Sequence, residues 1–175
     1  MLTTRKKEWF GEWFDSPYYH ILYKHRDMEE ARYFIDRLSD YLHFNREDHI
    51  LDLACGKGRH SIYLNSKGLK VTGLDLSVRN IEEANRHVND RLHFFVHDMR
   101  LPWHKNACDY VLNLFTSFGY FEKDQENAMA ISAAAEALKS NGKMVIDFLN
   151  PYTVVHNLVP EEIKLIGGIE FHIKK

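Results

Sequence analysis

Two glycines that follow an apolar segment form the part of this sequence most suggestive of chemistry. Residues 49–53, HILDL, lead into Gly56 and Gly58, and a helical pattern begins at residue 59. Glycine permits positive φ and lets a ligand lie against bare backbone, while the free N–H groups of the following helix can point at that ligand. The segment predicts a site for a nucleotide-type cofactor, although an ordinary strand-to-helix turn would use the same residues.

Two carboxylates support the cofactor interpretation, because each follows a later apolar segment. Asp75 comes after residues 69–74, and Asp98 comes after residues 92–97. Ligands of open α/β sheets bind at the carboxyl ends of the strands, so both acids should lie near the glycine turn. The two oxygens of Asp75 suit the hydroxyls of a ribose, and Asp98 can accept from an exocyclic amine such as that of adenine. Each residue could instead be a turn or helix-capping aspartate.

Apolar segments alternate with helical patterns through the middle of the chain. We expect strands near 49–54, 70–74, 92–97, 109–115 and 143–149, with helices near 59–67, near 78–89 and from Lys123 to the residue before Ser140. This alternation predicts an α/β fold, Rossmann-like and doubly wound, with a mostly parallel sheet and helices on both faces. In the last helix we expect a buried face made of Ala128, Ile131, Ala135 and Leu138.

The segment before this core is rich in aromatic side chains, which are Trp9, Phe10, Trp13, Phe14, Tyr18, Tyr19 and Tyr23. Such a segment should fold over apolar surface, either at the sheet edge or at the mouth of a ligand site. The segment DMEE at 27–30 resembles a capping box that begins a helix. Tyr19, Tyr23 and Arg26 are our candidates for a lid over the site, with plain packing as the alternative.

Length and composition limit the classes of protein that fit. The chain has 175 residues and a formal net charge of −2, which suits one domain and gives no electrostatic reason to expect nucleic acid as a partner. Cys55 and Cys108 fit a reduced protein, and no signal or membrane segment is visible, so we expect a cytoplasmic protein. We divide the single domain, 1–175, into an aromatic and helical lid (1–45), a cofactor-binding core (46–150) and a carboxyl-terminal part (151–175).

Three motifs resemble those of class I S-adenosylmethionine (SAM)-dependent methyltransferases in their order and spacing. They are DLACGKG at 52–58, GLDLS at 73–77 and HDM at 97–99. The resemblance spans about residues 17–150 and includes LFTSFGYF at 114–121, which is similar to the small-molecule branch of the family. It implies SAM as cofactor, S-adenosylhomocysteine as product and a small molecule as methyl acceptor.

The resemblance also implies roles for individual residues. Asp52 would face the methionine ammonium group, Asp75 would bind the ribose hydroxyls, and Leu76 would cover one face of adenine. The implied cofactor contacts are Asp52, Ala54, Cys55, Gly56, Gly58, Asp75, Leu76, Asp98, Met99 and Asn113. The acceptor would lie beside the segment after the fourth strand, where Phe115, Thr116 and Tyr120 are the candidates. No catalytic base is identified, because an in-line methyl transfer mainly requires alignment and a dry pocket.

The carboxyl-terminal part departs from the family pattern. Residues 163–173 predict either one hairpin or a sixth strand, and we find no sequence for the antiparallel strand with which the family fold ends. We therefore expect a truncated domain or one that a partner chain completes. An uncovered sheet edge favours self-association, so we predict a homodimer.

Four other interpretations differ from a small-molecule methyltransferase. The segment after the fourth strand is not of the Asn-Pro-Pro-Tyr type, which argues against a DNA base as acceptor. His93 and His97 share one face of a strand, but no third ligand converges on them, so we predict no metal site. A SAM-binding module without catalysis stays open, and an NAD-dependent oxidoreductase would need a third glycine where Ser61 stands.

Overall fold

The computed structural model describes residues 8–24 and 26–174. These residues form two compact units, which are described separately below. The larger unit comprises residues 26–148, and the smaller one combines residues 8–24 with residues 149–174.

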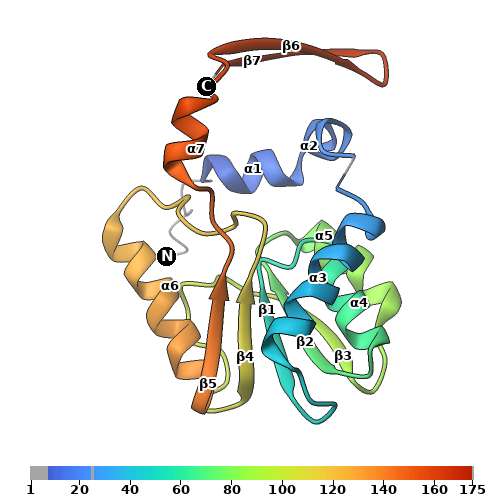
Figure 1. The fold of residues 1–175 in the computed structure, drawn as a ribbon, viewed down its shortest axis with the longest axis vertical. Coiled ribbons are helices and arrows are strands. Elements are labelled where there is room, and N and C mark those ends of the chain that lie inside the picture. Colours follow the sequence, from blue (N-terminus) through green and yellow to red (C-terminus); the bar gives the residue numbers. More distant parts are fainter. Residues whose placement is uncertain (1–7, 25, 175) are drawn as a thin grey trace, which may run out of the picture. The chain divides into compact units, whose positions relative to one another are not determined.

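A five-stranded parallel sheet forms the centre of the larger unit (Figure 1). Its strands are β1 (His49–Leu53), β2 (Lys70–Asp75), β3 (Leu92–Val96), β4 (Cys108–Asn113) and β5 (Leu138–Ile146). They lie in the order β3-β2-β1-β4-β5, and every neighbouring pair is parallel, which confirms the predicted fold class. The order reverses between β1 and β4, and ligands of open α/β sheets bind at such a switch point.

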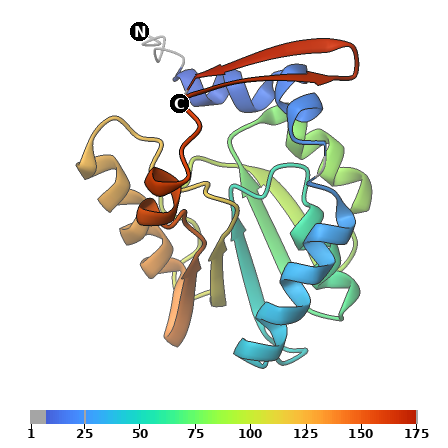
Figure 2. The same cartoon turned by 45° about the horizontal axis from the view of Figure 1, so that its top comes forward.

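Helices cover both faces of this sheet (Figure 1 and Figure 2). The helices are α3 (Met28–Leu42), α4 (Arg59–Ser66), α5 (Val78–Ala84) with the 3₁₀ turn η1 (Asn85–His87), and α6 (Asp124–Ala137). Ile35 of α3, Leu64 of α4 and Ile81 of α5 share one buried cluster with Ile50 of β1. The next residue of β1, Leu51, belongs to a second cluster with α6, because successive strand side chains point to opposite faces.

The amino end of α3 follows the sequence prediction. Asp27 caps the helix, and its Oδ1 accepts hydrogen bonds from the backbone N–H groups of Glu29 and Glu30 at 2.9 and 3.1 Å. Capping satisfies backbone donors that have no partner within the helix.

The buried face of α6 differs from the one we predicted. Ala128, Ile131 and Ala135 are exposed, and Leu138 is only partly buried at the start of β5. The buried residues are instead Ala130, Ala133, Ala134 and Ala137. Alanine stands on every side of this helix, so hydrophobic periodicity hardly distinguishes one face from another. The face that packs is a stripe of small side chains.

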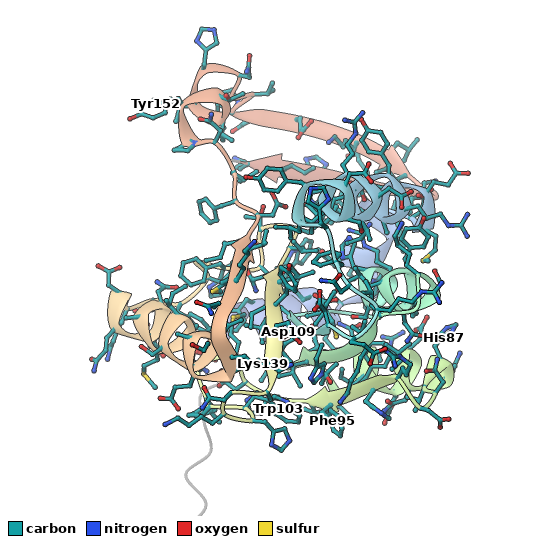
Figure 3. All side chains as sticks on the ribbon, turned by 60° about the horizontal axis from the view of Figure 1, so that its bottom comes forward. His87, Phe95, Trp103, Asp109, Lys139 and Tyr152 are labelled. Carbon is teal, nitrogen blue, oxygen red and sulfur yellow. The ribbon has the colours of Figure 1, made fainter. Side chains whose placement is uncertain are left out.

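No helix separates β3 from β4, and an aromatic loop packs there instead. Trp103 in this loop contacts Phe95 of β3, with ring centroids 5.1 Å apart (Figure 3). Trp103 also packs against the cluster that contains Leu51. At the amino ends of β4 and β5, Lys139 of β5 forms an ion pair with Asp109 of β4 at 2.7 Å.

The smaller unit contains three short helices and a hairpin. They are α1 (Trp9–Asp15), α2 (Pro17–Leu22), α7 (Pro151–His156), β6 (Glu161–Ile166) and β7 (Ile169–Lys174). β6 and β7 pair antiparallel around Gly167 and Gly168, both with positive φ, so the hairpin alternative is confirmed. No helix among residues 8–24 and 26–174 is long and apolar enough to cross a bilayer.

Candidate functional site

The turn between β1 and α4 is built from three residues with positive φ. Ala54, Gly56 and Gly58 have φ values of 59°, 57° and 80°. A side chain added to Gly56 would meet no atom within 4 Å, so this stretch of backbone faces open space. At Gly58 a Cβ would lie 2.6 Å from the ring of Phe94, so glycine is needed there for packing. The two glycines therefore serve different purposes, and only Gly56 leaves backbone open to a ligand.

Asp75 joins this turn to the carboxyl end of β2. Its Oδ2 accepts a hydrogen bond from the Gly56 N–H at 2.8 Å, and its Oδ1 accepts one from the Ser77 N–H at 2.8 Å. Ser77 itself caps α5 through its side chain. Each carboxylate oxygen can accept a second hydrogen bond, so these contacts are compatible with binding of a ribose diol. Leu76 follows Asp75 and is 44% exposed, so its side chain can cover a ligand.

Asp52 lies at the carboxyl end of β1 with only 2% of its surface exposed. Its Oδ2 accepts a hydrogen bond from the Ser61 hydroxyl at 2.5 Å. Burial, with a smaller contribution from the charge of Asp75, raises the pKa of this carboxyl to about 7. Among the described residues no lysine or arginine forms an ion pair with Asp52. A cationic ligand group beside it would stabilise the ionised form.

Asp98 is buried and paired with an arginine that we did not single out in the sequence. Arg100 donates from Nε to Oδ1 at 3.0 Å and from Nη2 to Oδ2 at 2.7 Å, and it also contacts Glu126 at 2.7 Å. An adenine amine would share the Asp98 oxygens with this guanidinium. Met99, between the two residues, is partly buried.

The segment after β4 has an unusual backbone. Phe115 and Thr116 both have a φ of 57°, a conformation that side chains with a Cβ rarely adopt. Asp147, which follows β5, holds the segment: its Oδ2 accepts from the Phe115 N–H at 2.9 Å, and its carbonyl accepts from the Thr116 N–H at 3.2 Å. Such strain persists only where the surroundings enforce it, and it is common at functional sites.

Asn113 closes β4 beside the glycine turn. Its Nδ2 donates to the Leu53 carbonyl at 3.1 Å. Its Oδ1 is buried and has no hydrogen-bond partner in the part of the chain that the structure describes. Buried polar atoms are normally hydrogen-bonded, so this oxygen is a candidate contact for a ligand.

The ring of Phe115 is surrounded by groups from the amino ends of α3 and α4. His60 stacks on it, with centroids 4.7 Å apart, and the Arg59 guanidinium lies 4.1 Å from its centroid. Arg26, one of the lid candidates, is 5.6 Å away. Burial lowers the pKa of His60 to about 3, so its ring is neutral at physiological pH. The larger unit thus brings Arg26, one of the three lid candidates, to this loop.

The remaining predicted residues are placed as follows. Tyr120 is partly buried in the loop after β4. Tyr19 and Tyr23 belong to the smaller unit, where their ring centroids lie 4.9 Å apart. The lid role of these tyrosines stays a prediction. Within the described ranges, no group of three His, Cys, Asp or Glu side chains could hold a metal ion.

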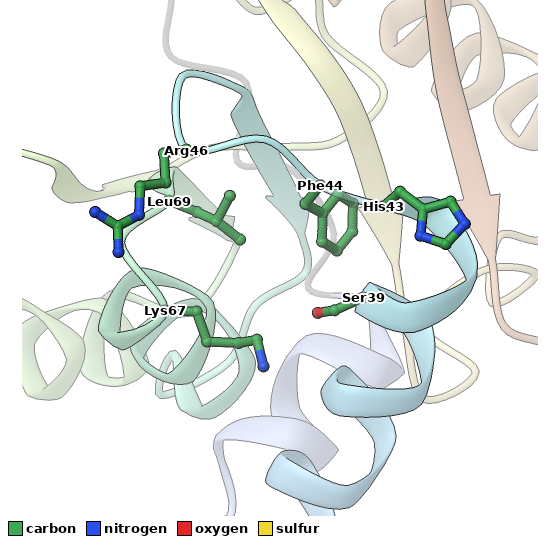
Figure 4. A pocket seen from close by; sticks show the side chains of 6 residues that line it. All are labelled: Ser39, His43, Phe44, Arg46, Lys67 and Leu69. Atoms are coloured by element: carbon green, nitrogen blue, oxygen red, sulfur yellow. The ribbon is translucent and has the colours of Figure 1, made fainter.

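A small pocket of about 120 Å³ lies elsewhere, at the amino ends of β1 and β2 (Figure 4). Its lining residues are Ser39, His43, Phe44, Arg46, Lys67 and Leu69. All of them precede the strands, whereas Asp52 and Asp75 stand at the carboxyl ends. This pocket is therefore separate from the candidate site.

Sequence reasoning missed Asp147, Arg59, Arg100 and the contact of Ser61 with Asp52. Asp147 could have been found, because it follows an apolar strand segment as Asp75 and Asp98 do. The other three have no such signal, because their partners lie on different elements or on a turn whose geometry the sequence does not specify.

This chain is similar to known proteins in both sequence and fold. Residues 50–142, more than half of the chain, match the family described as "Methyltransferase domain". A dTDP-3-amino-3,4,6-trideoxy-alpha-D-glucopyranose N,N-dimethyltransferase of Streptomyces venezuelae is 31% identical over 100 residues, which are 56% of this chain and 41% of that protein. The chain thus spans less than half the length of this curated relative.

Solved structures have the same fold. The sugar N-methyltransferase KedS8 from Streptoalloteichus superposes with a TM-score of 0.65 and 25% identity over 83% of this chain and 58% of that one. SAM-bound CalS10, an amino pentose methyltransferase from Micromonospora echinaspora, superposes with a TM-score of 0.65 at 23% identity over 86% of this chain and 64% of that one. With a matching domain, the three motifs and the parallel sheet in agreement, this chain belongs to the class I SAM-dependent methyltransferase family.

Proposed function

We propose that this chain binds SAM at the carboxyl ends of β1 and β2 and takes part in methyl transfer to a small-molecule acceptor. The observation that carries the proposal is the turn in which Gly56 presents open backbone while Asp75 holds its N–H group. Asp52, buried beside this turn and without an ion pair to a lysine or arginine among the described residues, fits the ammonium group of a methionine moiety.

The residues of the site would divide the work of binding. Asp75 accepts from the ribose hydroxyls, the backbone at 54–58 supports the methionine and ribose, and Leu76 covers adenine. Asp98 and Met99 lie where the adenine edge would be read, with Arg100 holding the Asp98 carboxylate in place. SAM, when bound, supplies an electrophilic methyl group for in-line displacement. The chain then has to orient the acceptor and exclude water.

The acceptor would lie beside Phe115, Thr116 and Tyr120. A small molecule is favoured because the relatives compared above are named for methylation of sugars. The stacked ring of Phe115 and the two arginines near it offer an apolar surface with a cationic rim. The acceptor itself is to be found by a screen, since a fold and a cofactor do not determine it.

An NAD-dependent function is disfavoured by Ser61. This residue stands where the dinucleotide fingerprint has its third glycine, and it is fully buried in contact with Asp52. Self-association through the sheet edge also stays a prediction. In the described residues β5 pairs only with β4, so its outer edge is the surface that light scattering would test.

Isothermal titration with S-adenosylhomocysteine, with NAD in parallel, tests the proposed function. We expect saturable binding of S-adenosylhomocysteine alone, followed by SAM turnover when a suitable acceptor is added. Folded protein that binds neither compound would refute the proposed cofactor site. Cofactor binding without turnover on a broad acceptor panel would favour a binding module instead.

A further inference from the structure

Asp52 is held in place by one side chain of the following helix. Ser61 of α4 is fully buried, and its hydroxyl donates to Oδ2 of Asp52 at 2.5 Å. This is the one hydrogen bond that the Asp52 side chain makes within the described residues. It fixes the carboxyl plane and leaves Oδ1 for another partner.

The charges around Asp52 do not neutralise it. Asp75, at the end of β2, lies close enough to raise the pKa of Asp52, and Arg59 of α4 lowers it less than burial raises it. The guanidinium of Arg59 is already paired with Glu30 of α3 at 2.7 Å. The thiol of Cys55 in the turn is neutral, because burial raises its pKa well above the usual value.

The neighbouring strands add no charge at this position. Asp52 pairs in register with Gly73 of β2 and Leu112 of β4. Asn113, the next residue of β4, carries an uncharged amide, and His60 of α4 is neutral. An ionised Asp52 therefore lacks a full counter-charge until a cationic group arrives. A protonated carboxyl is the alternative state that this environment favours.

We propose that Ser61 is a positioning residue that holds Asp52 for the ammonium group of the cofactor, and that this group displaces a proton from Asp52 when it binds. The inference rests on the proposed function. The O–H bond of the Asp52 carboxyl breaks, its proton passes to the buffer, and the carboxylate pairs with the ammonium. Because the pKa of unliganded Asp52 is about 7, the release depends on pH in the range where cells operate.

The test is titration with S-adenosylhomocysteine in phosphate and in Bis-Tris, two buffers with different protonation enthalpies. Near pH 6 we expect about one proton released per ligand bound, and near pH 8 almost none. The affinity should fall by up to about tenfold for each pH unit below about 7, since linkage equates this slope with the number of protons released.

Three variants separate positioning from packing. Asp52→Asn should bind more weakly and release no proton at either pH. Ser61→Ala should release protons up to a higher pH than the wild type, because the Ser61 hydrogen bond lowers the pKa of Asp52. Ser66→Ala is the matched control: it removes a hydroxyl from the same helix, one that donates to the Tyr63 carbonyl, and should keep the wild-type profile.

The outcomes are distinguishable. Wild-type binding whose heat is the same in both buffers near pH 6 would overturn the proton displacement and leave the proposed function standing. Absence of binding by folded wild type would overturn both. If Asp52→Asn does not fold, Ser61→Ala decides: a proton-release profile identical to that of the wild type would refute the positioning role.

Discussion

Two turns at the same edge of the sheet solve a similar geometric problem by different means. After β1, positive φ is adopted by Ala54, Gly56 and Gly58. The two glycines adopt it without strain, because they have no Cβ. After β4, Phe115 and Thr116 adopt it despite their large side chains. In both turns an aspartate from a neighbouring strand end accepts a backbone N–H, Asp75 in the first and Asp147 in the second.

The difference shows how a binding turn and an acceptor loop can be built. A cofactor that lies against backbone requires the absence of side chains, so glycine is suited to that turn. A loop that has to present side chains cannot use glycine and depends on tertiary contacts to hold it. Phe115, clamped against His60 and Arg59, meets that second requirement.

The largest expected effect is on the first turn. Asp75→Ala removes the acceptor of both the Gly56 and the Ser77 N–H groups, together with the proposed ribose contact. We expect S-adenosylhomocysteine binding to weaken by about 3 kcal/mol, or roughly 100-fold, while the protein stays folded. Isothermal titration measures the affinity and circular dichroism the fold. Unchanged affinity would refute the ribose assignment.

The pH dependence of stability sharpens the contrast, because Asp52 belongs to the first turn only. Its pKa is raised from the ordinary 3.8 of an aspartate to about 7 in the folded protein, so the folded state holds the proton more tightly. The stabilising contribution of Asp52 is then complete below about pH 4 and is lost as the pH rises to about 7. The free energy of unfolding of Asp52→Asn, measured in urea and compared with that of the wild type, should therefore rise by about 2 kcal/mol between pH 5.5 and pH 8. If the free energies of unfolding of the wild type and of Asp52→Asn change in parallel with pH, the raised pKa of Asp52 is contradicted.

In the second turn, loss of the aspartate should lower the stability of the protein and leave its affinity for the cofactor product nearly unchanged. Asp147→Ala leaves the Phe115 N–H without its acceptor. We expect the free energy of unfolding to fall by about 1 to 2 kcal/mol, with S-adenosylhomocysteine affinity within about threefold of wild type. Urea unfolding and titration measure the two quantities. A loss of affinity as large as that of Asp75→Ala would show that the two turns are not independent.

The smallest effect tests the strain itself. Thr116→Gly relieves positive φ in the second turn, while Ala54→Gly makes the equivalent change in the first. We expect Thr116→Gly to stabilise the protein by about 1 kcal/mol or less, and Ala54→Gly to have a smaller effect because alanine is not β-branched. Thermal unfolding compares the two variants. Destabilisation by Thr116→Gly would show that its side-chain contacts outweigh the strain.

The sequence by itself determined the order of the elements and the acids at the strand ends. Periodicity and glycine spacing are local properties, so β1, β2, β3 and the turn at 54–58 could be predicted within a few residues. The choice between a hairpin and a sixth strand at 163–173 could not, because both use the same alternating pattern. The buried face of α6 was also decided by packing, since its alanines carry almost no periodic signal.

Only the tertiary structure decided how the acids are used. Asp52, Asp75 and Asp98 look alike in the sequence, yet one is buried against Ser61, one holds the glycine turn, and one is paired with Arg100. Hydrogen-bond partners and burial depend on residues distant in the chain, and they set the charge and availability of each carboxylate. The residue types identify the ligand class, whereas the neighbours supplied by the fold determine the chemistry that each acid can perform.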